Sequence, residues 1–507
     1  MMKKLVKELK RTVVAFLIIS MTVTGVEMPV YASENNSRET VQNQKQINAK
    51  EEPKVIKELK NERTVDSNTY ILNNGMKKTV YYSDKIRYEE AGKVKEYNPE
   101  FVKVDNNDKK VIASSKVITE EKAEQYKYVN ESGDSKQYMP KMVREETPVL
   151  LTNDKYKVAF SPISDDEIQE DTMFENKTGK VEVESDNVTD SASGKKEDKK
   201  VKANYKYNKS DVALEYKSLE HGVKEDIILD SVPDTNVFSF SLVVENMEAK
   251  LDAVGGITFI DKDSDDIVGG IPAPVLNDAS ENGYSEDATY QLEQVECKKK
   301  NVNKYILKVV VNQSYLNDSK RVYPVSVDPT VTWTGTGDLP DVYVLKSSSG
   351  TNYYASGVRT FSVGKGSQGL FRSYFRATKL SGEIDNKYVE SAKLTIYENG
   401  AGNKGAKIQI RPVKEAFKCK TVTWDNQPGG TSAILTTFSS SGTSGAKKTI
   451  DLTNWARNIA KGSGDGHKNY GLLFRLEDES EASYVKFYGA RSTYTSKVPK
   501  LTVTYYD

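Results

Sequence analysis

The sequence has few of the residues that build disulfide frameworks, metal sites or nucleophile sites. Its 507 residues include two cysteines, Cys297 and Cys419, which is too few for a disulfide framework. The two histidines, His221 and His467, lie far apart and lack the spacing of a histidine metal site or of a Ser-His or Cys-His mechanism. The GxxxxGKS/T, HExxH and GxSxG signatures are missing as well. We therefore expect a protein that is not an enzyme and that needs no cofactor.

Long apolar runs are also scarce. The most apolar stretch, from Val13 to about Val26, is interrupted by a serine and two threonines and is shorter than the roughly 20 residues that span a bilayer. Lysines precede this stretch, and Ala32 ends a small-residue cleavage site. The pattern predicts a signal peptide at residues 1–32, with an uncleaved anchor as the alternative, and predicts no membrane span after cleavage.

Composition and pattern divide the rest of the chain into five segments. Residues 33–64 are polar, carry mixed charge and contain no aromatic residue, which is typical of a disordered spacer. Short alternating runs indicate that 65–160 and 204–335 are β-rich, and the acidic, lysine-rich stretch 161–203 between them predicts a linker or loop. The last segment, 336–507, is expected to form one β-sandwich module. The pattern leaves open whether the two β-rich segments form one domain or two.

Alternation of apolar and polar residues dominates the chain, so the fold class is expected to be mainly β. In SAKLTIYE, Ala392, Leu394 and Ile396 share one face, which is the pattern of a sandwich strand. The segment LTNWARNIAKG has helical periodicity and places Trp455 and Ile459 four residues apart on one side. We predict a C-terminal jelly-roll-like β-sandwich with one short helix, preceded by β-rich domains.

Six segments of the last third occur in an order that is typical of one kind of binding module. They are DVYVLKSSSGTNYYASGVRTFSVG, FRSYFRATKLSG, SAKLTIYE, TVTWDNQP, IDLTNWARNIAKG with NYGLLFRLED, and VKFYGARSTYTSKVPKLTVTYYD. Together they resemble the DNRLRE-type carbohydrate-binding modules, which implies a β-sandwich that binds a glycan. This sequence has Ala377-Thr378 where that family has Phe-Asp, so a carboxylate contact of the family is in doubt here.

The region before this module has a second resemblance. The segments VKEDIILD, GGIPAPVLNDAS, RVYPVSVDPTVTW and YEEAGKVKEYNPEFVKVD resemble the N-terminal part of secreted RHS-repeat wall-associated proteins. The resemblance implies an extracellular, cell-wall-associated location. The tyrosine-aspartate repeats and the C-terminal toxin domain of the large members do not occur in this sequence, so their delivery role is not carried over.

Charge is balanced over the whole chain, with 73 basic and 73 acidic residues, but it is not balanced along it. Residues 341–507 contain 24 Lys and Arg against 14 Asp and Glu, which is a net charge of +10, so residues 1–340 carry −10. A basic module is attracted to an anionic polymer. We expect a polysaccharide partner such as wall teichoic acid or a uronate polymer, and no nucleic acid. Positive charge that only aids solubility is the alternative.

Sugar recognition needs flat aromatic faces and side chains that bind hydroxyls or carboxylates. In FRSYFRA, Phe371 and Phe375 fit the core face of a strand. The alternating Arg372 and Arg376 are then expected to point outward. With Lys393 on a neighbouring strand, they are candidates to clamp a uronate or a phosphate; a solvated sheet face is the alternative.

The aromatic and carboxylate candidates lie in or beside predicted loops. Tyr353, Tyr354 and Trp424 are the candidates for stacking on a sugar, although Trp424 fits a core position equally well. Small β-sandwich binding modules often hold a structural calcium ion through loop oxygens, for which Asp341 and Asp425 are possible ligands.

Three classes of function follow from these observations. The first is a secreted, cell-wall-associated protein whose C-terminal module binds an acidic polysaccharide. The second is a non-catalytic structural or adhesive surface component, derived from an RHS-repeat wall protein, without glycan affinity. The third is an enzyme that uses two carboxylates, for which the sequence singles out no pair. We expect the first class, with the second as its alternative.

Overall fold

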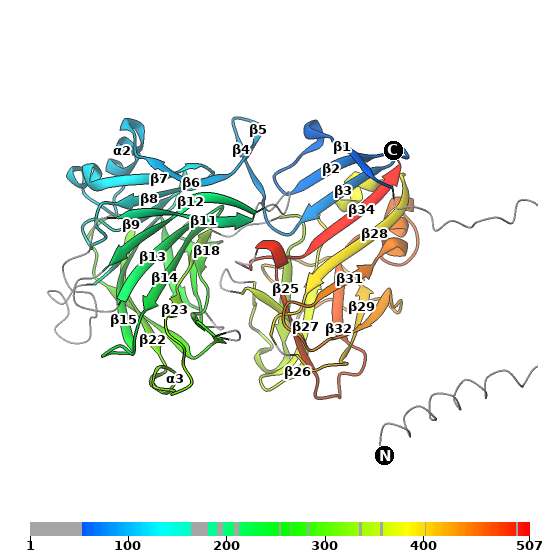
Figure 1. The fold of residues 1–507 in the computed structure, drawn as a ribbon. Helices are drawn as coiled ribbons and strands as arrows, with labels where there is room; N and C mark the ends of the chain where they lie inside the picture. Colours follow the sequence, from blue (N-terminus) through cyan, green and yellow to red (C-terminus); the bar gives the residue numbers. More distant parts are fainter. Residues whose placement is uncertain are drawn as a thin grey trace, which may run out of the picture. The chain divides into compact units, whose positions relative to one another are not determined.

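Antiparallel strands make up most of the computed structural model (Figure 1), which confirms the predicted mainly β fold class. The structure describes residues 53–506 without 164–180, 190–195, 207–211, 253–254, 265, 281–282, 334–336, 355–357, 401 and 493–494. Residues 53–507 cluster as one compact unit. Among the described residues, no helix is both long and apolar enough to cross a membrane. The predicted signal peptide, 1–32, lies outside the described residues.

The middle sandwich, built from residues 98–333, packs two sheets around one core. Its eight-stranded sheet has the order β21 (Ala288–Val295), β22 (Val302–Val311), β15 (Val237–Glu245), β10 (Lys157–Pro162), β9 (Val149–Thr152), β8 (Lys136–Pro140), β7 (Tyr126–Ser132) and β6 (Asn98–Lys103). Its eleven-stranded sheet has the order β11 (Glu182–Thr189), β12 (Lys196–Lys206), β13 (Val212–Leu219), β14 (Gly222–Leu229), β24 (Val331–Trp333), β18 (Ile267–Ile271), β17 (Ile257–Asp261) and β16 (Met247–Leu251), with β23 (Val325–Asp328), β19 (Val275–Asp278) and β20 (Tyr284–Ser285) beside β14.

The C-terminal sandwich packs a six-stranded sheet against a seven-stranded sheet. The six-stranded sheet has the order β1 (Val55–Glu58), β2 (Ser67–Leu72), β3 (Lys77–Tyr82), β34 (Lys500–Tyr506), β28 (Tyr388–Tyr397) and β31 (Lys447–Asp451). The seven-stranded sheet has the order β30 (Thr436–Ser439), β29 (Lys407–Pro412), β32 (Leu472–Leu476), β27 (Gly369–Phe375), β26 (Thr360–Gly366) and β33 (Tyr484–Tyr488), with β25 (Asp341–Leu345) paired to β27. Leu394 and Val503 from the first sheet and Phe361 and Phe474 from the second share one core.

The remaining elements are short and connect or cover the sheets. The hairpin of β4 (Arg87–Glu90) and β5 (Lys93–Glu96) precedes the middle sandwich. The helices are α2 (Asn106–Ala113), α3 (Gln313–Leu316), α4 (Leu380–Ile384) and α5 (Thr453–Lys461), and the 3₁₀ turns are η1 (Lys60–Glu62), η2 (Glu120–Gln125), η3 (Lys346–Ser348) and η4 (Thr495–Lys497).

The predicted helix is confirmed as α5, and its apolar side faces the core. Trp455 and Ile459 are 1% and 4% exposed, and burying each of them stabilises the fold by about 2–3 kcal/mol. Gly462 ends the helix in the left-handed conformation, with φ of 63°. At the start, the carboxylate of Asp451 accepts a hydrogen bond from the Thr453 amide at 2.8 Å. The Thr453 hydroxyl does not cap the helix and instead accepts a bond from a strand amide.

The alternation read from the sequence is confirmed in the C-terminal sandwich. Ala392, Leu394 and Ile396 of β28 are at most 1% exposed. A GxGxxG run, Gly364–Gly369, forms the hairpin connection between β26 and β27. It joins two antiparallel strands and does not open a helix, as a dinucleotide-binding loop of that spacing would.

The boundary expected before the C-terminal module is wrong, because distant residues complete its sheet. β1, η1, β2 and β3 span residues 55–82, which the sequence assigns to the spacer and to the next β-rich segment. Strand β3 pairs with β34 over six residue pairs, from Lys77 with Tyr505 to Tyr82 with Lys500. In Figure 1 the blue strands β1–β3 lie beside the red β34. A sheet edge accepts any strand of suitable register, wherever that strand lies in the sequence.

From β6 onward, the first β-rich segment forms one domain with the second, 204–335. Strand β10 from the first pairs with β15 from the second along its whole length. The predicted linker 161–203 is also partly wrong, because β11 and the first half of β12 lie within it and pair with each other. Charged residues are abundant in β11 and in the first part of β12, and such a composition is also typical of a disordered linker.

Candidate glycan-binding surfaces

The face of β27 that was expected to meet solvent is covered by a second layer of side chains. Tyr374, on the same side as the two arginines, is fully buried and packs against Val413, Val422 and Leu473. Val413 and Val422 come from the irregular segment that follows β29, and Leu473 comes from the neighbouring strand β32. Sequence alternation does not predict this covering layer, because a strand face that carries two arginines is typical of a solvated surface.

Arg372 is half-buried and paired. Its Nε and Nη2 donate to the two carboxylate oxygens of Glu479 at 2.7 and 2.6 Å, and its guanidinium lies 4.8 Å from the centre of the Trp424 ring. Such a bidentate pair is geometrically specific and neutralises the arginine. Trp424 is partly buried against the same cluster, so it occupies the core-like position that its alternation allowed.

Arg376 is also held by the protein. Its Nη1 donates to the carbonyl of Phe417 at 3.3 Å, and its guanidinium lies 5.8 Å from the Phe417 ring. Its Nε is buried without a hydrogen-bond partner among the described residues. The outward orientation expected for both arginines is therefore wrong in this structure, since each contacts a residue of the covering layer.

The two loop tyrosines lie inside the sandwich. Tyr353 is 5% exposed and stacks on Tyr343 with ring centres 4.5 Å apart. Tyr354 is 4% exposed and lies under the guanidinium of Arg491 at 4.4 Å. The exposed stacking faces expected from their loop positions are thus absent at these two residues.

Asp341 and Asp425, the two candidate calcium ligands, contact different groups of the protein. Asp341 is 1% exposed, accepts a hydrogen bond from the Ala490 amide at 3.0 Å and lies 3.7 Å from Arg491. Burial raises the pKa of Asp341, and Arg491 opposes the rise. Asp425 accepts a bond from the Ser349 hydroxyl at 3.0 Å. The described part of the chain contains no group of three His, Cys, Asp or Glu side chains suited to a metal ion, and calcium stays a prediction.

Lys393 lies on the six-stranded sheet, away from Arg372 and Arg376 on the other sheet. It belongs to what we call the lysine face, the outward side of three neighbouring strands. Its members are Lys393, Thr395 and Tyr397 of β28, Lys447 and Thr449 of β31, and Lys500, Thr502 and Thr504 of β34. The register pairs Thr395 with Lys500 on one side and with Thr449 on the other, so these side chains form one continuous polar surface.

The lysine face is positively charged. Lys393, Lys447 and Lys500 form no salt bridge among the residues that the structure describes. Burial lowers the pKa of Lys500, and the charge of Lys447 lowers it further. Asp451 is the cross-strand neighbour of Lys393 at the sheet edge. Three ammonium groups on adjacent strands with one neighbouring carboxylate favour an anionic ligand.

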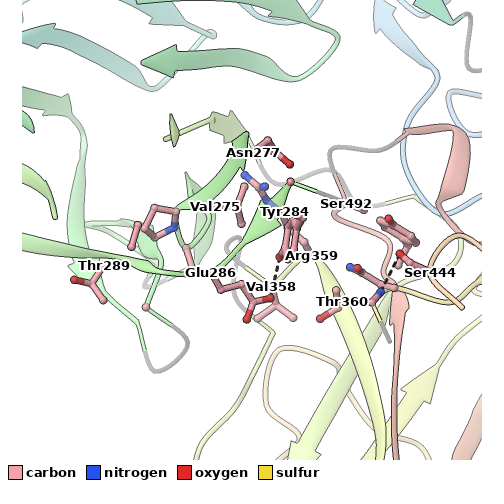
Figure 2. Close-up of a pocket in the computed structure, with 18 of the residues that line it drawn as sticks. Val275, Asn277, Tyr284, Glu286, Thr289, Val358, Arg359, Thr360, Ser444 and Ser492 are labelled. Atoms are coloured by element: carbon pink, nitrogen blue, oxygen red, sulfur yellow. Dashed lines mark hydrogen bonds between the residues drawn. The ribbon is translucent and has the colours of Figure 1, made fainter. Parts of the chain in front are cut away.

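A pocket of about 900 Å³ lies elsewhere in the unit. One wall comes from the middle sandwich and carries Asn277, Tyr284 and Glu286 (Figure 2). The opposite wall comes from the C-terminal sandwich and includes Thr360 and Ser444. The sequence offered no signal for this pocket, because its walls join segments more than 50 residues apart whose side chains are individually ordinary.

Comparison with known proteins supports the predicted C-terminal carbohydrate-binding module. The sequence profile of carbohydrate-binding module family 96 matches residues 303–505. The matched range contains Lys393, Lys447 and Lys500 of the lysine face, but it omits the strands β1–β3 that complete the same sheet.

Bacterial relatives align over longer stretches. A protein named tRNA nuclease WapA from Bacillus subtilis is 22% identical over 550 residues, covering 100% of this chain and 21% of the relative. The tRNA(Glu)-specific nuclease WapA of Bacillus subtilis subsp. natto is 22% identical over 98% of this chain and 20% of that protein. The tRNA3(Ser)-specific nuclease WapA of Bacillus spizizenii is 24% identical over 58% of the chain. The chain thus spans about a fifth of the length of the first two relatives.

Proposed function

We propose that this chain is an exported, non-catalytic protein whose C-terminal sandwich binds an anionic polysaccharide through the lysine face. The family match of residues 303–505 supports a carbohydrate ligand. The observation that carries the choice of an anionic one is the set of three lysines without salt bridges on adjacent strands. Wall teichoic acid and uronate polymers both offer the repeated negative charges that such a surface attracts.

The lysine face suits a polymer better than the arginines do. Arg372 is already held by Glu479 in a half-buried bidentate pair. Binding a ligand there costs these hydrogen bonds and leaves Glu479 with Arg475, 3.0 Å away, as its cation. Within the described part of the chain, the ammonium groups of Lys393, Lys447 and Lys500 form no salt bridge, and that of Lys500 lies 5.1 Å from the centre of the Tyr82 ring. Threonine hydroxyls between them, at Thr395 and Thr502, are hydrogen-bond groups for sugar hydroxyls. Tyr397, partly exposed beside Lys447 across the strands, adds an aromatic ring at the same surface.

Nuclease activity is not part of this function. The relatives are named as tRNA nucleases, but the chain aligns with about a fifth or less of their length at 22–24% identity. The part of this chain that matches a family matches a binding module. Export rests on the signal-peptide pattern of residues 1–32 and on the resemblance to secreted wall-associated proteins.

The test compares the full chain with a Lys393→Ala, Lys500→Ala double variant for binding to teichoic acid, polygalacturonate and a neutral glucan. We expect salt-sensitive binding to at least one anionic polymer and weaker binding by the variant. Each exposed charge contributes about 0.5–1 kcal/mol, so the loss is about five- to thirtyfold in Kd. Isothermal titration or surface plasmon resonance at low and raised salt measures it.

Lys365→Ala with Lys407→Ala is the matched control, because both lysines are exposed on the seven-stranded sheet of the same sandwich. An equal loss in this control would show that net charge alone drives binding. Absence of binding to every polymer would favour the structural or adhesive component without glycan affinity.

A further inference from the structure

We propose that the pocket of Figure 2 is a second carbohydrate site, which takes a short neutral oligosaccharide. The inference rests on the proposed function in one respect, that the ligand is a carbohydrate. It uses other residues and another kind of ligand, so the two proposals can fail separately. The volume of about 900 Å³ lies within the range of about 300–1,000 Å³ that is typical of ligand pockets.

The pocket offers an exposed aromatic ring in a defined orientation. Tyr284 is 49% exposed, in contrast to the buried Tyr353 and Tyr354 of the predicted site. Its hydroxyl donates a hydrogen bond to Oε1 of Glu286 at 2.8 Å (Figure 2). A ring that is fixed at its polar end and open on its surface is suited to contact the apolar C–H face of a sugar.

Polar groups surround this ring. The Glu286 carboxylate uses Oε1 for its hydrogen bonds to Tyr284 and to Lys486, which leaves Oε2 to accept from sugar hydroxyls. The side chains of Asn277, Thr289 and Thr360 line the same space and supply amide and hydroxyl groups. An apolar floor with a few hydrogen-bonding groups is the usual composition of a small-ligand site, and the floor here consists of Val275, Ala288, Val358 and the partly apolar Tyr290 and Tyr343.

The charges of the pocket favour a neutral ligand. Asp278 pairs with Arg321, Arg359 lies 3.7 Å from Asp328, and Glu286 pairs with Lys486 at 3.2 Å. Although burial opposes the charge of Asp278, hydrogen bonds from Ser280 and Arg321 hold its pKa at about 2. Asp278, Arg359 and Glu286 therefore each have an opposite charge beside them. Lys497, which also lines the pocket, lies 5.0 Å from the centre of the Tyr488 ring. The lysine face, in contrast, has three cations and one neighbouring carboxylate.

The experiment is titration calorimetry of the full chain with cellotetraose and with tetra-N-acetylchitotetraose, two neutral tetrasaccharides, at low and raised salt. We expect at least one tetrasaccharide to bind with the same affinity at both salt concentrations, because no net charge is neutralised. Tyr284→Ala is expected to weaken this binding about two- to tenfold, and Glu286→Gln is expected to weaken it as well. Tyr284→Phe keeps the ring and should retain most of the affinity.

Tyr388→Ala is the matched control. Tyr388 is also an exposed tyrosine, at 59%, but it does not line the pocket. It begins β28, and the pocket residue Asn399 follows the opposite end of that strand. The Lys393→Ala, Lys500→Ala variant should bind the tetrasaccharide normally even if it loses the anionic polymer. Binding of neither sugar, or unchanged affinity in both Tyr284→Ala and Glu286→Gln, would overturn the proposal. Thermal melting of each variant separates loss of the site from loss of the fold.

Discussion

The two sandwiches differ in how the chain supplies their strands. Every strand of the middle sandwich comes from one continuous stretch, residues 98–333. The six-stranded sheet of the C-terminal sandwich instead joins β1–β3, from residues 55–82, to strands that begin at residue 388. The sandwich that carries the lysine face thus depends on residues that precede the whole middle sandwich.

The comparison shows that a region of sequence similarity is not always a folding unit. The family match begins at residue 303, which includes β23 and β24 of the middle sandwich. It stops at 505 and contains none of β1–β3, although β3 lies between β2 and β34 in the sheet. A family match identifies local segments that recur among related proteins. It does not identify which distant segment pairs with the edge of a sheet.

The largest expected effect is the loss of the N-terminal strands. Removing residues 53–82 uncovers the edge of β34 and removes Leu72 and Tyr81, each 3% exposed, from the fold. We expect the C-terminal sandwich to lose more than about 5 kcal/mol of stability, which exhausts the stability of many domains. Urea unfolding and limited proteolysis of a chain that lacks residues 53–82, and of an isolated 336–507 fragment, measure the effect.

A fusion of residues 53–86 to 336–507 through a flexible linker is the matching rescue. It should restore a cooperative transition, because it supplies β1–β3 to the open edge. A fragment 336–507 that unfolds cooperatively at the same urea concentration as the fusion would mean that the strands are an accessory to the sandwich.

The next largest effect compares how much a buried aromatic side chain stabilises the C-terminal sandwich and the middle sandwich. Trp455→Ala removes a side chain that is 1% exposed, and Phe240→Ala removes one that is fully buried and stacks on Phe160 at 4.7 Å. Each should lower the free energy of unfolding by about 3–5 kcal/mol. Urea unfolding monitored by tryptophan fluorescence and by circular dichroism measures both. A loss below about 1 kcal/mol for Trp455→Ala would show that α5 is not part of the folded core.

A smaller effect concerns pH and the junction of the two segments of the C-terminal sandwich. Lys379 lies 2.7 Å from Asp66 and 3.1 Å from Asp338. Burial raises the pKa of Asp338 to about 7, and the charge of Asp66 adds to the rise. The folded state therefore holds a proton that the unfolded chain releases at a pH near 4. Stability from this group is present below about pH 4 and is lost as the pH rises to about 7.

Asp338→Asn keeps the hydrogen-bonding shape and removes the titration. We expect the loss of stability between about pH 4 and 7 to be smaller in this variant, by about 1 kcal/mol over the window. Asp226 of the middle sandwich has a pKa raised to about 6 by burial and contributes its own slope. The quantity to measure is therefore the difference between variant and parent in how the free energy of unfolding changes with pH. The same pH dependence in both proteins would contradict the role assigned to Asp338.

The smallest expected effect is at an exposed ion pair between the sandwiches. Lys420 lies 3.0 Å from Asp266, and both side chains are about half exposed. Exposed ion pairs contribute little to stability, so Lys420→Ala should leave the free energy of unfolding nearly unchanged. A larger loss in thermal or urea unfolding would mean that this contact couples the two sandwiches.

The predicted site illustrates how far sequence reasoning reaches. Alternation correctly put Arg372 and Tyr374 on one face of a strand, but it does not reveal that the segment with Phe417, Val422 and Trp424 covers this face. Lys393 was expected beside the arginines. It lies on the other sheet, because strand neighbours in a sandwich do not follow from sequence order.

The sequence by itself determined the mainly β class, the helix at Trp455 and the inward face of β28, because each depends on side chains a few residues apart. It also determined the excess of positive charge in the last third. The tertiary structure alone decided which strand completes the six-stranded sheet, which lysines share a face, and that Tyr284 and Thr360 line one pocket. These features depend on contacts between residues far apart in the chain, which no local periodicity encodes.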